Sequence, residues 1–585
     1  VPEVPEVPEV PEEPTPEEPE EPTPEEPEEP TPEEPEEPTP EEPEEPTPEE
    51  PEEPTPEEPG RQATERDTAL LTLVTNLGFS PSELRDRSLP QPGDPIVELG
   101  KELFFSRSLS FEDDVACVSC HDPRLAGTDN LSLPVGVGAH DPLIVGPGRR
   151  HDGNYYIDPK ADFGPNVPRN SPTTFNIAFY DKAMFWEGRV ETVAYSEGNS
   201  LYLPVDSGAD NGEGALIRTP DSFSNGPDHN AGNNLTTAQA RFPVTSVAEM
   251  RGFSAAAGQT SKEIRRLISV KLAERGWEMA FREGFNDYVS ELETLLSYDN
   301  IAFALAEYQR SQVAIDNRFF DYLDGNTDAL SAEAVEGGIL FFSENQGGCY
   351  QCHAGPHFSD ENYYALATPQ IGRGKNSFSQ DYGRYNITRS TYDRHSFRTP
   401  SLLNVGLTFP YMHAGSLGTL REAINWHFNP VTSLRNFDFS LQNLEQYAGL
   451  GVDTSESASL VTSINYSYMA LKYAPGYSEK LSMPQATATQ LDQYEAFLTA
   501  LSSQCLQDLT CVSAWMPDYS TPSPDGMRIE PVLSYFDNSE VFTVTEPEGE
   551  ETGNAVFPDL SDIPPYPDAI CALPSVPSPD ETNVI

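Results

Sequence analysis

The chain has 585 residues, a net charge of −61 at neutral pH, 57 prolines and seven cysteines. Residues 1–59 hold 27 glutamates and no Lys or Arg, which leaves a net charge of −34 for residues 60–585. Such a surplus repels phosphate, so it excludes a nucleic-acid binder as the default class. No apolar run approaches the roughly 18 residues of a membrane-spanning helix, and no transmembrane segment is expected.

Residues 1–60 are predicted to be a disordered linker. They repeat Val-Pro-Glu and then an eight-residue unit, Pro-Thr-Pro-Glu-Glu-Pro-Glu-Glu. Proline lacks a backbone donor and neighbouring glutamates repel, so the arm is expected to stay extended. It is interpreted as a solvated spacer or as a stalk that holds a folded domain away from a membrane or cell wall. Because the chain starts without Met or an export signal, it is expected to be a mature or trimmed form.

The remaining sequence predicts a mainly α-helical protein with long ordered loops. Helical periodicity is found in residues 69–77, 95–105, 261–285, 290–323, 332–344, 419–428 and 487–501. Residues 122–170 and 191–242 are rich in Gly, Pro, Asn and Asp and are predicted to be long loops, the second an insertion.

Two Cys-x-x-Cys-His groups carry the chemistry of the sequence. This motif attaches c-type haem: the two thiols add to the porphyrin vinyl groups and the histidine becomes an axial iron ligand. The residues are Cys117, Cys120 and His121 in the first group, and Cys349, Cys352 and His353 in the second. Two covalently bound c-type haems are therefore predicted.

The competing interpretations of these cysteines are a zinc site, a redox dithiol and a structural disulfide. A zinc site would pair two Cys-x-x-Cys groups without a fixed histidine after each, so haem is favoured. Since c-type haem is attached outside the cytoplasm, the protein is expected in the periplasm or on the bacterial cell surface.

The two halves of the chain share a pattern. In each, a predicted helix ends in an aromatic pair, Phe104-Phe105 or Phe341-Phe342, and the haem motif follows. This repetition predicts two related, cytochrome c-like haem domains. The expected divisions are residues 61–325 for the N-terminal domain, 326–504 for the C-terminal domain and 505–585 for an extension of unknown role.

Several longer motifs resemble the bacterial di-haem cytochrome c peroxidase family, which includes MauG. They are Pro168–Asn176, Phe185–Arg189, Gly348–Pro356, Phe397–Asn404 and Pro410–Gly415, and the resemblance covers about residues 90–503. It implies that the N-terminal haem meets peroxide and that the C-terminal haem transfers electrons.

The resemblance also implies roles for single residues. Trp186 matches the tryptophan between the haems. Glu249 follows Pro243 by six residues and matches the distal carboxylate that moves a proton between the peroxide oxygens. His140 is the candidate for the distal histidine, with His151 as a rival.

The sixth ligand of the C-terminal haem departs from the family pattern. The family places Met or, in MauG, Tyr 17 residues after a Thr-x-Pro proline, and here that proline is Pro410 and the residue is His427. Ligation by His353 and His427 is therefore expected, while Met412 and His413 match a different position. Histidine in place of methionine lowers the reduction potential of the haem, which favours a MauG-like function.

The family further implies one Ca²⁺ between the haem domains. Its ligands map onto the Asn170 side chain and the carbonyls of Thr408 and Pro410, with water completing the shell. Oxygen donors of this kind suit a hard cation.

Three cysteines remain near the C-terminus. Cys505 and Cys511 are candidates for a small disulfide loop, and Cys571 is an alternative partner for either. One thiol is left over whichever pair forms.

Three functions compete. The first is a peroxidase that reduces hydrogen peroxide with electrons from a small cytochrome c or cupredoxin. The second is a MauG-like enzyme that oxidises Trp or Tyr of a partner protein, and the third is a non-enzymatic electron-transfer cytochrome. Glu249 and Trp186 argue against the third, because an electron carrier needs neither. A homodimer is possible, and fold resemblance alone does not decide the substrate.

Overall fold

The computed structural model covers the whole chain and separates residues 1–59 from a compact unit of residues 60–585. Described residues are 63–152, 165–193, 195–197, 200–202, 216–223, 226–253, 257–344, 347–372, 374–376, 380–439, 467, 470, 485–537 and 540–543. The predicted Pro-Glu arm and Cys571 lie outside them. None of the described helices has the length and apolar character needed to cross a membrane.

The described part of the chain is mainly helical, as predicted. Its α-helices are α1 Glu65–Asn76, α2 Ser82–Arg85, α3 Pro95–Phe105, α4 Leu235–Gln239, α5 Ser261–Glu274, α6 Glu278–Phe285, α7 Leu292–Leu295, α8 Tyr298–Ser311, α9 Arg318–Leu323, α10 Ala332–Phe342, α11 Tyr385–Thr388, α12 Leu420–Phe428, α13 Pro430–Asn436, α16 Ala488–Thr499 and α17 Leu509–Val512. Short 3-10 turns and long loops connect them.

The strands are short. They are β1 Ile144–Val145, β2 Ala183–Met184, β3 Val190–Thr192, β4 Tyr195–Glu197, β5 Ser200–Tyr202, β6 Ile217–Arg218, β7 Tyr363–Tyr364, β8 Phe397–Arg398, β9 Val532–Asp537 and β10 Glu540–Thr543. Strands β2, β3 and β6 form one sheet, and β4 pairs with β5. The predicted insertion at 191–242 therefore contains strands and the short helix α4, where only loops were expected.

Helix boundaries follow local sequence signals. The predicted helix at 95–105 is α3, which has Pro95 in its first turn, where a missing N–H costs nothing. The predicted helix at 261–285 is broken into α5 and α6, because Gly276 takes a φ of +87°. Glycine populates this left-handed region at little cost, so it ends helices.

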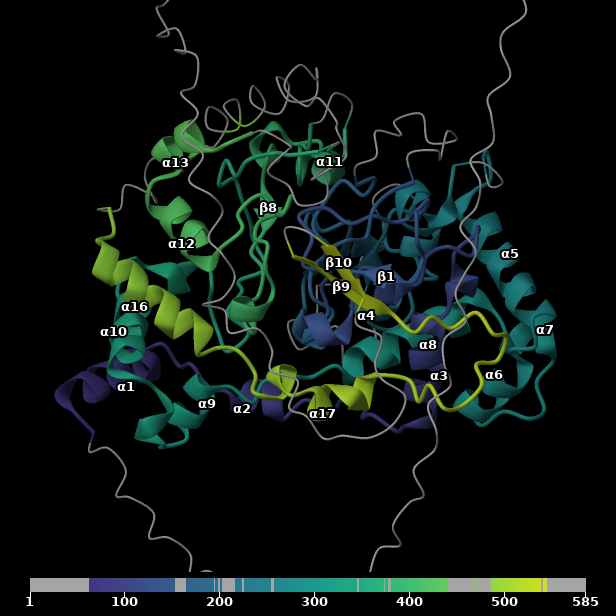
Figure 1. The fold of residues 1–585 in the computed structure, drawn as a ribbon, viewed down its shortest axis with the longest axis horizontal. Coiled ribbons are helices and arrows are strands. Elements are labelled where there is room, and N and C mark those ends of the chain that lie inside the picture. Colours follow the sequence, from purple (N-terminus) through teal and green to yellow (C-terminus); the bar gives the residue numbers. More distant parts are fainter. Residues whose placement is uncertain are drawn as a thin grey trace, which may run out of the picture. The chain divides into compact units, whose positions relative to one another are not determined.

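Buried apolar side chains gather in two principal clusters within the compact unit. The first contains residues of α3, α5, α6 and α8, and the second contains residues of α1, α9, α10, α12 and α16 (Figure 1). Helix α1, at the start of the described chain, packs against α10 and places Leu70 in the second cluster.

A repeated glycine brings helices close together in both clusters. Gly-x-x-Leu-Phe-Phe occurs at the end of α3 and again at the end of α10. A Cβ added at Gly100 would overlap the Ala304 carbonyl oxygen of α8, and one at Gly337 would overlap the Gln493 carbonyl oxygen of α16. The pattern shared by the two halves of the sequence thus corresponds to two equivalent close helix contacts.

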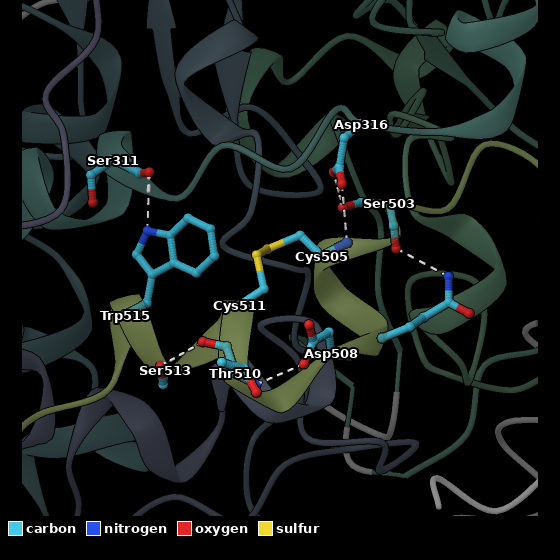
Figure 2. The surroundings of a disulfide bond; sticks show 10 residues. Ser311, Asp316, Ser503, Cys505, Asp508, Thr510, Cys511, Ser513 and Trp515 are labelled. Atoms are coloured by element: carbon cyan, nitrogen blue, oxygen red, sulfur yellow. Dashed lines mark hydrogen bonds between the residues drawn. A yellow bond between two sulfur atoms is a disulfide. The ribbon is translucent and has the colours of Figure 1, made fainter. Parts of the chain in front are cut away.

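The segment after α16 returns to the first cluster. Its side chains Leu506, Val512, Trp515 and Ile529 are buried there, and β9 pairs in parallel with β1. Cys505 and Cys511 form a disulfide, which confirms that pairing, and the Cys505 N–H donates to Asp316 Oδ2 at 3.1 Å (Figure 2). The Trp515 indole donates to the Ser311 carbonyl at 3.1 Å. The described part of the extension is therefore built into the fold.

Candidate haem cavity

A cavity of about 850 Å³ contains all six residues of the two Cys-x-x-Cys-His groups in its wall. The first phenylalanine of each aromatic pair, Phe104 and Phe341, lines it as well. The further predicted site residues that line it are Asn170, Trp186, Glu249, Thr408, Pro410 and His427. The structure thus brings together nearly all of the predicted site.

Both motifs fold in the same way. Cys117 and Cys349 each begin a 3-10 turn, and the carbonyl of each accepts the N–H of the histidine four residues later, at 3.1 and 2.9 Å. This turn brings both cysteines and the histidine of each motif to the cavity. The structure forms no disulfide between any of these four cysteines.

The two motif histidines are oriented alike. His121 Nδ1 lies 3.1 Å from the Gly127 carbonyl, and His353 Nδ1 lies 3.0 Å from the Phe358 carbonyl. A carbonyl fixes Nδ1 as the protonated nitrogen and leaves Nε2 as the ligating atom. Burial lowers the pKa of His121, and burial together with nearby His427 lowers the pKa of His353 to about 4. Both rings are held in the neutral form that a metal ligand requires.

His427 is presented to the cavity by α12, which Thr419 caps. Its Nδ1 lies 2.7 Å from the Ala423 carbonyl one turn earlier, so Nε2 is again the nitrogen left for a ligand. Burial lowers the pKa of His427, which favours the neutral ring.

His413 differs from the three oriented histidines. Its Nδ1 lies 3.0 Å from Thr368 Oγ1, its Nε2 lies 3.0 Å from Gln370 Oε1, and its ring stacks on Phe397 at 3.8 Å. With both nitrogens in hydrogen bonds, it has none left for a metal. The choice of His427 over His413 is consistent with these contacts.

Trp186 and the predicted calcium ligands are physically linked. The Trp186 indole N–H donates to the Asn170 carbonyl at 3.0 Å, and Asn170 Nδ2 donates to the Leu131 carbonyl at 3.0 Å. Thr408 and Pro410 line the same cavity. The residues predicted to bind Ca²⁺ thus share the cavity with Trp186.

Glu249 lies on a single turn of π-helix, Val247–Arg251. Such turns are rare and are frequent at functional sites. The turn is anchored by the Val137 N–H, which donates to the Ala248 carbonyl at 3.0 Å. Arg189 Nη2 lies 4.0 Å from Glu249 Oε1, which pairs the carboxylate with a cation at the cavity wall.

Gln239 is a cavity residue that the sequence alone does not indicate. Its side chain lines the cavity, and its Oε1 is buried without a hydrogen-bond partner among the described residues. A buried unpaired acceptor is costly, which favours a donor supplied by a ligand or water in the cavity.

A buried charge network at the cavity wall is not evident from the sequence. Arg169 donates to Asp381 through Nε and Nη2 at 2.6 and 2.8 Å, and also pairs with Glu187. Glu187 accepts a second bond from Arg189 at 2.9 Å. Burial by itself would raise the pKa of Glu187, but the two guanidinium groups outweigh it and hold that pKa well below the usual range.

His140 does not reach the cavity. Its side chain is exposed, and its backbone N–H donates to the Arg150 carbonyl at 2.9 Å. His151, the rival, is buried outside the cavity wall. The distal histidine remains a prediction.

Comparison with known proteins shows several to which the chain is similar. Residues 94–328 match the family model for di-haem cytochrome c peroxidase. The chain is 27% identical to cytochrome c551 peroxidase of Pseudomonas aeruginosa, over 57% of this chain and 72% of the relative. It is 25% identical to the methylamine utilization protein MauG of Methylophilus methylotrophus, over 62% and 84%. The diheme peroxidase BthA of Burkholderia thailandensis aligns at a TM-score of 0.45, with 19% identity over 76% and 92%.

The helical fold and the paired motifs define a haem-dependent oxidoreductase of the peroxidase class. The chain is similar to the di-haem cytochrome c peroxidase and MauG family, and this similarity implies haem cofactors.

Proposed function

We propose that this enzyme reduces hydrogen peroxide to water at an N-terminal haem and receives its electrons through a C-terminal haem. The single observation that carries the proposal is one cavity lined by both haem motifs together with Glu249 and Trp186. The haems, when bound, supply the redox chemistry. Each turnover takes two electrons and two protons as one peroxide becomes two waters.

The protein side chains hold the two cofactors differently. Cys117, Cys120 and His121 would hold the N-terminal haem, and Cys349, Cys352, His353 and His427 would hold the C-terminal one. At the C-terminal site both imidazoles carry the proton on Nδ1, which donates to a backbone carbonyl. Two neutral imidazole ligands stabilise the oxidised iron relative to a thioether ligand.

Glu249 is the proposed acid-base group. Breaking the O–O bond requires a proton to move from one peroxide oxygen to the other, and a carboxylate within reach of both is suited to this. The π-helical turn and the Arg189 guanidinium fix its position at the cavity wall. Gln239 supplies an acceptor in the same cavity.

Trp186 is proposed to lie on the electron path between the two haems. Its indole N–H is bonded to the carbonyl of Asn170, whose side-chain oxygen is a proposed Ca²⁺ ligand together with the carbonyls of Thr408 and Pro410. Calcium bound there would fix Trp186 through Asn170. The ion is thus proposed to order the electron path.

A MauG-like function is the second candidate, and His427 favours it. A strong-donor ligand at the C-terminal haem helps to retain oxidising equivalents, which could then oxidise Trp or Tyr of a partner protein. In the peroxidase function the partner is instead an electron donor, a small cytochrome c or cupredoxin. Both functions place the protein in the periplasm or on the cell surface.

EPR of the ferric, haem-loaded protein before and after one equivalent of hydrogen peroxide tests the proposal. A high-spin signal beside a low-spin bis-histidine signal is expected, and peroxide should change the high-spin one. Loss of both signals would favour the MauG-like function. Two low-spin signals that peroxide does not alter, even after one-electron reduction, would refute the enzymatic functions. The protein would then be an electron-transfer cytochrome.

Glu249→Gln tests the carboxylate directly. The rate constant for the reaction with peroxide, measured by stopped flow, should fall about 10²-fold or more, the usual contribution of a general acid-base group. Glu274→Gln is the matched control, because Glu274 is an exposed glutamate of α5 outside the cavity wall. Equal rates in the two variants would remove Glu249 from the mechanism.

A further inference from the structure

The segment that carries Trp186 is held by side chains from the C-terminal half of the chain. Glu361 accepts the backbone N–H groups of residues 181–183 at 2.8 to 3.0 Å, just before and at the start of β2. Beyond the tryptophan, Arg384 donates to the carbonyls of residues 187–188 at 3.1 and 2.9 Å. A segment that precedes the second haem motif is thus fixed on both sides by residues that follow that motif.

Arg398 contacts the two peptide groups that flank Trp186 itself. Its backbone N–H donates to the Trp186 carbonyl at 2.8 Å, and its Nε donates to the Phe185 carbonyl at 3.3 Å. The guanidinium is also fixed, because its central carbon lies 3.8 Å from the centroid of the Tyr180 ring and the residue is only 8% exposed. Arg398, Trp186 and Tyr180 all line the cavity. One buried arginine therefore links the cavity wall to the backbone of the tryptophan.

Phe185 has a backbone conformation that needs such support. Its φ is +67°, in the left-handed region that residues with a Cβ rarely adopt. This conformation costs free energy and persists only where the surrounding contacts hold it. Arg398 bonds the Phe185 carbonyl, and the Arg189 guanidinium lies 3.4 Å from the centroid of the Phe185 ring. The direction in which the chain presents the next residue, Trp186, to the cavity thus depends on these contacts.

We propose that Arg398 is a positioning residue of the electron path, whose guanidinium fixes the Phe185–Trp186 peptide group and so sets the orientation of the Trp186 indole. The proposal rests on the proposed function, in which Trp186 carries electrons between the two haems. The carbonyl of Asn170 holds the same side chain at its indole N–H, so Trp186 is fixed at both its backbone and its ring. A lysine would supply the charge of Arg398 but not the flat group that stacks on Tyr180 while Nε reaches the carbonyl.

The first test measures the position of Trp186 and does not depend on turnover. The chain has four tryptophans, so labelling with 5-fluorotryptophan gives four ¹⁹F resonances, and Trp186→Phe identifies its own by removing it. In the ferric, haem-loaded protein, unpaired electrons displace each resonance according to its distance and direction from the iron. Arg398→Lys should shift or broaden the Trp186 resonance and leave those of Trp277 and Trp515, which are buried outside the cavity wall, unchanged. Arg398→Met, which removes every side-chain donor, should shift it further. Destabilisation of the whole fold would not affect one tryptophan alone.

The second test is a double-mutant cycle on electron transfer between the haems. Protein reduced at the C-terminal haem is mixed with hydrogen peroxide by stopped flow, and the reoxidation of that haem is followed by its absorbance. Arg398→Lys and Trp186→Phe should each slow the reoxidation about tenfold or more, because a shift of about 1 Å in a reacting group can cost about 10²-fold in rate. The double variant should be no slower than Trp186→Phe, since the effect of Arg398 passes through Trp186.

Arg85→Lys is the matched control for the substitution of Arg398. Arg85 also stacks on an aromatic ring, at 5.8 Å from the centroid of Phe320, and pairs with Asp324 at 2.8 Å, but it lies outside the cavity wall. This variant should match wild type both in the rate of reoxidation and in the Trp186 resonance.

The outcomes separate this proposal from the proposed function. Reoxidation that is as fast in Trp186→Phe as in wild type would refute the electron path and the role of Arg398 with it. Slow reoxidation in Trp186→Phe, together with the wild-type rate in both Arg398 variants, would refute the role of Arg398 alone. A Trp186 resonance that neither variant shifts would refute it as well. So would a further loss of rate when Arg398→Lys is added to Trp186→Phe, because Arg398 would then act elsewhere in the cavity.

Discussion

Replacing Gly337 by alanine tests whether the close crossing of α10 and α16 contributes to the stability of the fold. A Cβ at Gly337 would overlap the Gln493 carbonyl oxygen and lie 2.6 Å from its carbon and 2.8 Å from Phe497 Cβ. Ordinary contacts begin near 3.4 Å, so α16 must move away by more than 1 Å. Since two of these atoms are backbone, no side-chain rotation relieves the overlap.

The expected cost follows from two opposing effects. Overpacking of this kind costs about 1–3 kcal/mol, while exchanging glycine for alanine within a helix recovers up to about 1 kcal/mol. A net loss of about 2 kcal/mol is expected for Gly337→Ala, because its overlap lies at the severe end of that range.

Gly338 provides a matched control one residue further along. Its nearest neighbours are Leu70 Cδ1 and Cδ2 at 3.0 Å and Phe497 Cδ2 at 3.2 Å, which are ends of side chains that can shift. Gly338→Ala should therefore change stability by less than about 1 kcal/mol. Urea unfolding followed by far-UV circular dichroism compares the two. Equal midpoints for Gly337→Ala and Gly338→Ala would refute the reasoning about helix contact.

Three further changes have expected outcomes. Burial raises the pKa of Asp129 to about 7. The folded protein therefore keeps a proton on this carboxyl that the unfolded chain releases above about pH 4. As a result, the free energy of unfolding falls as the pH rises from about 4 to about 7. The full difference corresponds to about 4 kcal/mol, and Asp129→Asn should gain stability relative to wild type at pH 8 but not at pH 4, by urea unfolding at each pH. His427→Met should raise the reduction potential of one haem by on the order of 100 mV, a fraction of the roughly 0.8 V that axial ligands span. A spectroelectrochemical titration measures this potential. An unchanged value would exclude His427 as a ligand. Replacing Cys505 and Cys511 by alanine should cost about 2 kcal/mol for a loop this short, and should leave the peroxide reaction intact.

The sequence predicted best those features that depend on nearby residues. Helix periodicity located α3, α10 and α16 to within a few residues, because each has an apolar face. A side-chain cap marks the start of α10 and α16, and Pro95 marks the start of α3. The haem motifs were recognised for the same reason, since their chemistry lies within five consecutive residues. His427 was located by its spacing from Pro410, and it lines the cavity as that spacing implied.

Features that depend on distant pairs could not be predicted. Arg169 and Asp381 are 212 positions apart, and in a sequence with 96 acidic residues nothing distinguishes Asp381 from a surface charge. The return of the C-terminal segment to the first cluster depends on the pairing of β9 with β1, nearly 400 residues apart, and two short strands carry no signal of a partner.

The buried network is better explained as a device for geometry than for stability. Removing a carboxylate and a guanidinium from water costs about as much as their attraction returns, so Arg169, Asp381 and Glu187 are weak evidence of a more stable fold. Their contribution is to fix the position of the Glu249 carboxylate. Asp381 fixes Arg169, Arg169 fixes Glu187, and Glu187 holds Arg189 within 4.0 Å of Glu249. Since a shift of about 1 Å in a reacting group can cost about 10²-fold in rate, a fully paired network is a reasonable way to hold that carboxylate.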